Sequence, residues 1–249
     1  MSGTIAKLAL HSTSNNANAY TIPASGSFTP TAGKVLVVFG IIGGTVDTAP
    51  TCSGSANSLT FSKISSDPHA LAGFLTVLFV SSVVPSSPAA MTVTVNCPTD
   101  AGTSALLWVA EVDGILAGGA SAVRSVSGTP QFGKSVDIAA NGSWGVSLPA
   151  APLSTNPILG FLGSVGTNQA TGSGVSPPTG FTEVEEPVDQ SAAVIGAEFC
   201  KAESGIGSAG PHSWTASVGR TRANIYIVEF DTTSGGGPTL DKTDFFLVL

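Results

Sequence analysis

The stretch LWVAEVD at residues 107–113 returns as IYIVEFD at residues 225–231, and this pair of stretches decides the fold. Both are apolar, rich in β-branched and aromatic residues, and end in Glu-x-Asp. Such runs are typical of buried β-strands. Glu111 and Glu229 are 229 − 111 = 118 positions apart, so one strand recurs in the second half of the chain. Because each carboxylate lies where a strand ends, we expect it to anchor a turn or to face a partner subunit.

Four further strand-like segments match across nearly the same interval. Residues 35–40 match 157–163, 59–64 match 179–184, 74–83 match 194–203, and 91–95 match 212–216. In this alignment Phe61 pairs with Phe181 and Phe79 with Phe199, each pair 120 positions apart (181 − 61 and 199 − 79). Five segments in one order at a nearly constant offset predict an internal duplication.

The remainder of the chain also predicts an all-β fold. Short runs rich in β-branched residues alternate with clusters of turn formers, and the chain contains 30 Gly and 16 Pro. No stretch of helical length keeps a 3.6-residue apolar period free of Gly and Pro. The expected strands are residues 34–42, 58–64, 74–84, 91–96, 105–112, 143–148, 158–165, 180–185, 192–201, 212–218 and 223–230.

The repeat predicts two tandem, internally duplicated β-sandwich units of jelly-roll-like size. We expect the first unit in residues 1–116, the second in residues 117–233, and a glycine-linked C-terminal tail in residues 234–249. Two copies are too few for a solenoid. Two arrangements stay open: two abutting sandwiches, or units merged into one large sandwich with pseudo-two-fold symmetry.

The C-terminal tail has no counterpart in the first copy. It ends in five apolar residues, Phe245, Phe246, Leu247, Val248 and Leu249. Exposed on a monomer, such a segment would promote aggregation. It is therefore expected either to fold back on its own unit or to be donated to a neighbouring subunit as a partner-binding strand.

The composition favours association with other proteins. Charged residues make up only 10% of the chain, against about 25% in ordinary soluble domains. A surface with so few charges does little to repel its neighbours, so we expect a homo-oligomer or an assembly component. The net charge of −7 and the scattered Lys and Arg argue against nucleic acid as a partner.

Membrane insertion and export are not expected either. The longest apolar run, residues 74–84, is interrupted by hydroxyl residues and is shorter than the roughly 20 residues that a membrane helix needs. The first 17 residues lack the apolar core of a signal peptide, which predicts synthesis in a cytoplasm without export by that route.

No motif predicts catalysis or a cofactor, so we expect neither. Residues 162–166, LGSVG, lack the first glycine of a nucleophile elbow. Residues 205–210, GIGSAG, match a dinucleotide fingerprint, but a strand and not a helix is predicted after them. Cys52, Cys97 and Cys200 lack the close spacing of a zinc site and are expected to be buried thiols.

Two binding hypotheses rest on single clusters. The acidic residues Glu183, Glu185, Glu186 and Asp189 suit either a calcium site or, as we favour, a solvated strand face. Of the three tryptophans, Trp144 is the least constrained by the repeat and is the candidate glycan contact.

The repeat units resemble β-sandwich and jelly-roll structural proteins of tailed-bacteriophage particles. The resemblance rests on residues 34–40 (KVLVVFG), 178–184 (PTGFTEV), 107–114 (LWVAEVDG) and 225–231 (IYIVEFD), and it covers about residues 30–232 as a strand pattern. It implies a capsid decoration, head-fibre or tail component, found in the virion after assembly in the host cytoplasm. Its partners would be other virion proteins, such as the major capsid or tail protein.

No functional residues are carried over by this resemblance, because such proteins act through surfaces. The alternative is a carbohydrate-binding or adhesion module on the same β-sandwich scaffold. An exposed aromatic side chain beside polar groups would favour that alternative.

Overall fold

A computed structural model of the chain describes residues 3–13, 17–69, 73–139, 143–165, 175–189, 195–203, 206–216 and 222–232. The described chain is all-β: its strands pair antiparallel in several sheets. The C-terminal tail, including Phe245, Phe246, Leu247, Val248 and Leu249, lies outside the described residues.

The first half of the chain forms two sheets. A five-stranded sheet has the order β1-β8-β3-β6-β5, and a three-stranded sheet has the order β2-β7-β4. The bounds are β1 Ile5–Thr13, β2 Ala19–Ile22, β3 Val35–Gly43, β4 Thr51–Gly54, β5 Phe61–His69, β6 Phe74–Val83, β7 Val93–Asn96 and β8 Ser104–Val112.

The second half forms the same two kinds of sheet. Its large sheet has the order β11-β19-β13-β17-β15, with β16 beside β17, and its small sheet has the order β12-β18-β14. The bounds are β11 Phe132–Ala139, β12 Ser143–Val146, β13 Ile158–Val165, β14 Val175–Ser176, β15 Thr182–Glu185, β16 Val188–Asp189, β17 Ile195–Ala202, β18 His212–Ala216 and β19 Arg222–Glu229. With β16 left aside, the strands of the two halves follow one order.

The segment between the halves contains a 3₁₀ turn, η1 Gly119–Ala122, and a short hairpin of β9 Ser125–Val126 and β10 Thr129–Pro130. Gly118, just before η1, lies so close to the backbone of Ser82 that a Cβ there would approach within 2.5 Å. The connection is therefore packed against the first half.

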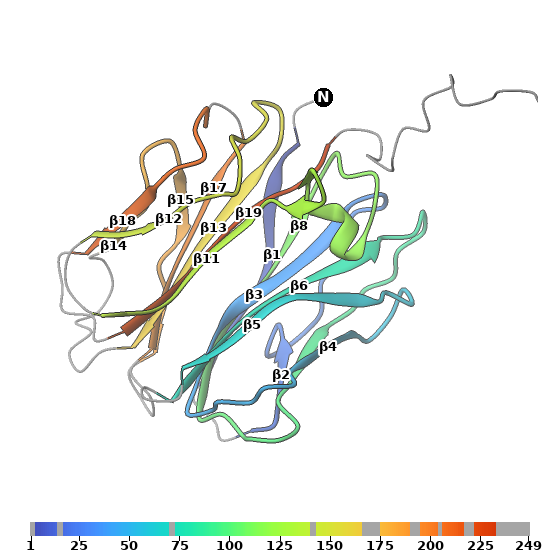
Figure 1. The fold of residues 1–249 in the computed structure, drawn as a ribbon. Helices are drawn as coiled ribbons and strands as arrows, with labels where there is room; N and C mark the ends of the chain where they lie inside the picture. Colours follow the sequence, from blue (N-terminus) through green and yellow to red (C-terminus); the bar gives the residue numbers. More distant parts are fainter. Residues whose placement is uncertain are drawn as a thin grey trace, which may run out of the picture.

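The sheets stack in four layers, with the two large sheets facing each other in the middle and a small sheet on each outer side (Figure 1). A central apolar cluster lies between the large sheets and takes residues from both halves. Two further clusters each fill the space between one large sheet and its small sheet. We call each pair of a large and a small sheet a unit, and the contact between the large sheets the unit interface.

The position of the large sheets explains the uninterrupted apolar runs in the sequence. All nine residues of β3, VLVVFGIIG, are buried. Val37 and Phe39 point into the central cluster, whereas Leu36 and Val38 point into the first unit's own core. A strand that is buried on both faces cannot show polar alternation.

The small sheets show the opposite pattern. Along β2, exposed Ala19 and Thr21 alternate with buried Tyr20 and Ile22. This alternation is expected for a sheet with one wet face.

Contacts across the unit interface come in related pairs. Phe39 lies opposite Trp108 in the first large sheet. Phe161 lies opposite Tyr226 in the second. The rings of Phe39 and Phe161 contact each other edge to face, with centroids 6.0 Å apart. Two corresponding positions in contact are what a two-fold axis through the interface requires.

An ion pair lies at each side of the interface, between equivalent strands but not between equivalent residues. Lys7 of β1 binds Glu185 of β15. Lys134 of β11 binds Asp67 of β5, with 2.7 Å between Nζ and Oδ1. In each case a lysine from the first strand of one unit reaches a carboxylate on the fifth strand of the other, so both sides of the interface are joined by an ion pair between the same kinds of strand.

One detail of the sequence alignment is wrong. Phe79 points into the core of the first unit, whereas Phe199 points into the central cluster. Phe39 pairs with Leu78, and Phe161 pairs with Phe199. Leu78 is therefore the structural counterpart of Phe199, and a shift of one residue moved the aligned phenylalanine to the other face of its strand.

Candidate functional site

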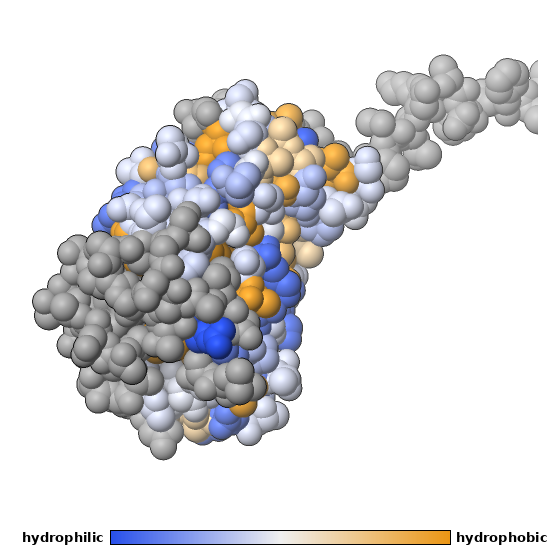
Figure 2. Space-filling view, turned by 60° about the vertical axis from the view of Figure 1, so that its left-hand side comes forward, coloured by the Kyte–Doolittle hydropathy of each residue, from blue (hydrophilic) through white to orange (hydrophobic). Residues whose placement is uncertain are grey.

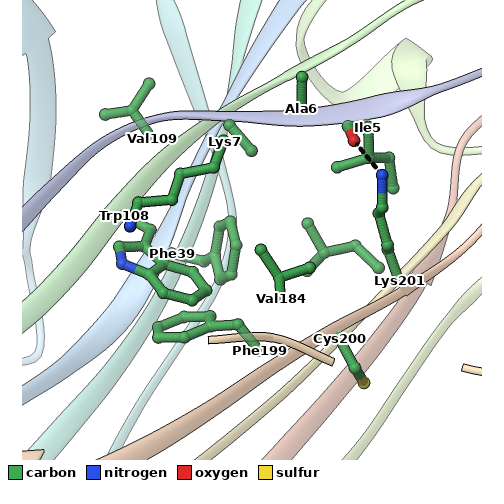
Figure 3. Close-up of a pocket in the computed structure, with 12 residues that line it drawn as sticks. Ile5, Ala6, Lys7, Phe39, Trp108, Val109, Val184, Phe199, Cys200 and Lys201 are labelled. Carbon is green, nitrogen blue, oxygen red and sulfur yellow. Dashed lines mark hydrogen bonds between the residues drawn. The ribbon is translucent and has the colours of Figure 1, made fainter. Parts of the chain in front are cut away.

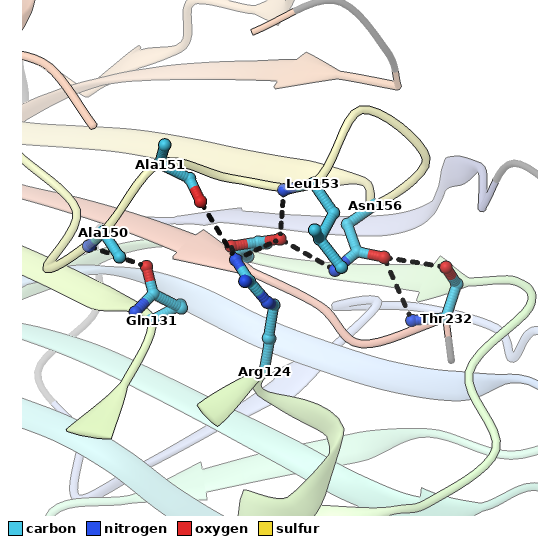
Figure 4. A network of polar contacts seen from close by, with 8 residues as sticks. Arg124, Gln131, Ala150, Ala151, Leu153, Asn156 and Thr232 are labelled. Atoms are coloured by element: carbon cyan, nitrogen blue, oxygen red, sulfur yellow. Dashed lines mark hydrogen bonds and ion pairs between the residues drawn. The ribbon is translucent and has the colours of Figure 1, made fainter. Parts of the chain in front are cut away.

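The two Glu-x-Asp stretches that open the sequence analysis anchor loops. Glu229 is fully buried and accepts hydrogen bonds from Arg124 Nη1 (2.9 Å), the Leu153 backbone N–H (2.9 Å) and Asn156 Nδ2 (2.7 Å). Figure 4 shows how these donors converge from separate segments. The network holds the loop before β13 against the end of β19.

Glu111 anchors a loop of the first unit in the same way. It accepts hydrogen bonds from the Thr31 backbone N–H (3.1 Å), the Thr31 hydroxyl (3.0 Å) and Lys34 Nζ (2.7 Å). These donors lie in the segment before β3. The expectation that the two glutamates anchor turns is confirmed, and their role in the described chain is structural.

A second polar cluster lies at the unit interface. Tyr226 donates a hydrogen bond to Asp67 Oδ2 (2.7 Å), and its hydroxyl lies 2.8 Å from Thr76 Oγ1. Burial opposes ionisation of Asp67, but hydrogen bonds from Lys134 and Tyr226 outweigh it and lower the pKa of the Asp67 carboxyl. Burial and the neighbouring Asp67 carboxylate raise the pKa of Tyr226 well above its ordinary value. The cluster ties β5 and β6 of one unit to β19 of the other.

The other side of the interface contains a cavity of about 180 Å³ (Figure 3). It lies between β1 and β8 of the first unit and β15 and β17 of the second. Phe39, Trp108, Leu159, Val184 and Phe199 supply most of its apolar wall. This cavity is the candidate functional site, because it combines an apolar interior with polar groups at its rim.

Two amino groups flank the cavity. Lys7 Nζ, ion-paired with Glu185, lies 5.4 Å from the centre of the Trp108 ring, within range of a cation–π contact. Lys201 belongs to β17 and stands on the opposite wall in Figure 3. The lysine side chains are 37% and 27% exposed, and each amino group is ion-paired with a glutamate.

Lys201 also protects the edge of β1. Its Nζ donates to the Ile5 carbonyl (2.7 Å) and to Glu203 Oε1 (2.7 Å), and Glu203 accepts from the Ile5 N–H (3.0 Å). Burial opposes ionisation of Glu203, but these two donors lower the pKa of its carboxyl. Both outward backbone groups of Ile5 are thus satisfied by side chains of the other unit.

A wider hollow of about 430 Å³ lies on the second unit, between the Pro178–Gly180 turn and the segment before β18. His212 lines it and packs edge to face on Phe181, with 5.6 Å between ring centroids. Burial lowers the pKa of His212, although its hydrogen bond to the Ser208 backbone acts against this.

The candidate glycan contact is not at the surface. Trp144 is only 3% exposed, pairs with Trp214 in the small sheet and points into the core of the second unit. A buried indole cannot stack on a sugar ring, so the hypothesis was wrong for this side chain. It was missed because alternation in the short strand β12 (SWGV) could not show which face is buried.

The acidic cluster is divided among separate contacts. Glu185 binds Lys7, and Glu186 accepts a hydrogen bond from the Val175 backbone N–H (3.1 Å). Within the described ranges, no group of three or more His, Cys, Asp or Glu side chains is placed to hold a metal ion.

The cysteines are free thiols in apolar surroundings. Cys97 and Cys200 are buried and Cys52 is partly buried. Burial raises the pKa of Cys97 to about 12 and raises the pKa values of Cys52 and Cys200 as well. The expectation of buried thiols is confirmed for Cys97 and Cys200.

No protein-family model, curated protein or solved structure matches this chain. In the part of the chain that the structure describes, no helix has the length and hydropathy of a membrane span.

Proposed function

We propose that this protein is a non-catalytic structural component of a virus particle, such as a phage capsid decoration or a head- or tail-associated protein. It acts through contacts with other virion proteins and with further copies of itself. The observation that carries the proposal is the character of the two outer sheet faces.

Neither small sheet carries a charged residue. The strand sequences are AYTI, VTVN and TCSG in the first unit, and SWGV, HSWTA and VS in the second. On the outer face of the first, Thr94 lies between Thr21 and Ser53. On the outer face of the second, Thr215 lies beside Ser176.

Such faces suit burial against another protein. Removing a hydroxyl from water costs much less than removing a charge, and hydroxyls find new partners easily. The cores of protein interfaces are depleted of charged residues. In the space-filling view, in which the side carrying β12, β14 and β18 comes forward, pale residues of intermediate hydropathy make up much of the described surface (Figure 2).

We also infer that the two units are diverged copies of one jelly-roll-like sandwich. The matching strand orders and the contact between Phe39 and Phe161 support this inference. Eight strands in two antiparallel sheets, as in β1–β8, are the size of a jelly roll.

The C-terminal segment is the second proposed attachment element. Phe245, Phe246, Leu247, Val248 and Leu249 would contact a neighbouring subunit once the chain is in a particle. Deletion of residues 239–249 should then reduce attachment or oligomerisation while the sandwich units stay folded.

The test introduces a charge at the centre of each outer face. Thr94→Lys and Thr215→Lys should each reduce incorporation into particles at least about tenfold, since burying an unpaired charge costs several kcal/mol. Leu116→Lys is the matched control, because Leu116 is 62% exposed and lies outside both small sheets. Incorporation is measured by quantitative mass spectrometry and immunogold labelling of purified particles. Absence of the wild-type chain from the particles would overturn the proposal.

A carbohydrate-binding module is the competing hypothesis, and burial of Trp144 removes the aromatic side chain assigned to it. A glycan array with the purified chain decides between the two. Specific binding of one glycan class, together with absence from particles, would favour the module.

A further inference from the structure

The cavity makes the two sides of the unit interface different from each other. Lys7 lies opposite Ala110, and Phe132 lies opposite Val228. Ala110 and Val228 occupy corresponding places in β8 and β19, each two residues beyond the central aromatic residue of its strand. Lys7 and Phe132 are therefore counterparts on the two sides of the pseudo-two-fold axis.

Phe132 and Lys7 make different contacts with the aromatic residue beside them. Phe132 places its ring edge to face on Tyr226, with 5.4 Å between centroids, and packs against the central cluster. Lys7 instead extends over Trp108, the counterpart of Tyr226, and the cavity lies beside it. The ring of Phe132 thus fills, beside Tyr226, the place that corresponds to the cavity beside Trp108.

The size and wall of the cavity suit such a ring. Its volume of about 180 Å³ compares with about 150 Å³ for an apolar protein cavity that binds benzene. Phe39, Trp108 and Phe199 offer ring faces and edges to an aromatic occupant.

We propose that the occupant is a phenylalanine ring of the chain's own C-terminal segment, from Phe245 or Phe246. The described chain ends at Thr232, whose side chain lies against Gly3, two residues before Ile5 of the cavity wall. Phe245 follows Thr232 by 245 − 232 = 13 residues, a flexible reach of about 20 Å. A tether of this length gives an effective concentration on the order of millimolar.

The charges near the ring also match. Asp244 directly precedes Phe245. Lys7 and Lys201, which are ion-paired with Glu185 and Glu203, line the cavity and place positive charge beside it. Docking would cover an apolar segment that otherwise promotes aggregation. This inference goes beyond the particle proposal, because it concerns the free chain.

Photo-crosslinking of the full chain tests the docking. Phe246 is replaced by p-benzoylphenylalanine, and the purified protein is irradiated at low micromolar concentration and digested. We expect crosslinks within one chain to the peptides that carry Lys7, Val184 or Lys201. Lys7→Phe fills the cavity and should lower their yield at least tenfold, whereas Lys63→Phe, at an exposed position of β5, should leave it unchanged.

Three outcomes would overturn the proposal: crosslinks mainly to other regions, crosslinks only between chains, or a yield that does not respond to Lys7→Phe. Thermal melting of each variant shows whether it is folded. Val184→Trp, which narrows the mouth of the cavity from the second unit, is the independent blocking variant. No particle is present, so the result leaves the virion proposal to its own test.

Discussion

Single carboxylates fix the loops and the interface of this protein. Glu229 has no exposed surface and three donors from separate segments. We expect Glu229→Gln to lower the free energy of unfolding by about 3 kcal/mol, because a buried charge network loses one partner. For a chain of this size that corresponds to a melting temperature lower by about 6 to 12 °C. Glu183→Gln, at an exposed strand position, is the control and should change the melting temperature little.

Asp67 should make the stability of the folded protein depend on pH. Its pKa is lowered in the folded protein, so the stability that it contributes is present above the ordinary Asp pKa of about 4 and is lost as the pH falls through the folded value. Asp67→Asn should cost about 2 kcal/mol at pH 7. The difference from the wild type should shrink between pH 4 and pH 2. Urea unfolding across this range measures it, and a constant difference would contradict the assignment.

At the scale of elements, the sequence identified the strands that are buried on both faces. Ile158–Val165 was predicted with the bounds that the structure shows, because its short, mostly apolar run contains glycines and is too short for a buried helix. Two strands at the edges of the large sheets were missed. Ile5–Thr13 and Phe132–Ala139 mix Lys, His, Ser and Asp with apolar residues, and each pairs through one edge only.

The same edge strands explain why the cavity could not be predicted. Its asymmetry depends on Lys7 and Phe132, which the sequence does not align because neither strand belongs to the matched segments. Only the pairing with β8 and β19 makes them counterparts. The alignment of residues 107–113 with 225–231, by contrast, already placed Trp108 of the cavity wall in a buried strand.

This comparison of edge strands gives a prediction on stability. Lys7→Phe places in the first unit the ring that Phe132 provides in the second, and it should raise the free energy of unfolding by about 1 kcal/mol. The lost ion pair with Glu185 is partly exposed and offsets little of this gain. Chemical denaturation measures the change. A destabilised variant would mean that the two positions are not equivalent.

On the scale of the whole molecule, the central apolar cluster belongs to both units. Neither large sheet is covered on its inner face without the other, so we expect one cooperative thermal transition with equal calorimetric and van't Hoff enthalpies. Phe161→Ala should lower the free energy of unfolding by about 3 to 4 kcal/mol. The protein should still unfold in one transition, at a lower temperature. Two resolved transitions in scanning calorimetry would contradict the shared core.

Covalent connection of the two sandwiches has a consequence for their symmetry. In a homodimer with a two-fold axis, the same residue lies at both sides of the interface. Such a dimer therefore has a cavity at both sides or at neither. Within one polypeptide the flanks are free to differ, with a lysine on one and a phenylalanine on the other. A single polypeptide with two units can therefore have a cavity at one flank only, an asymmetry that a symmetric homodimer cannot have.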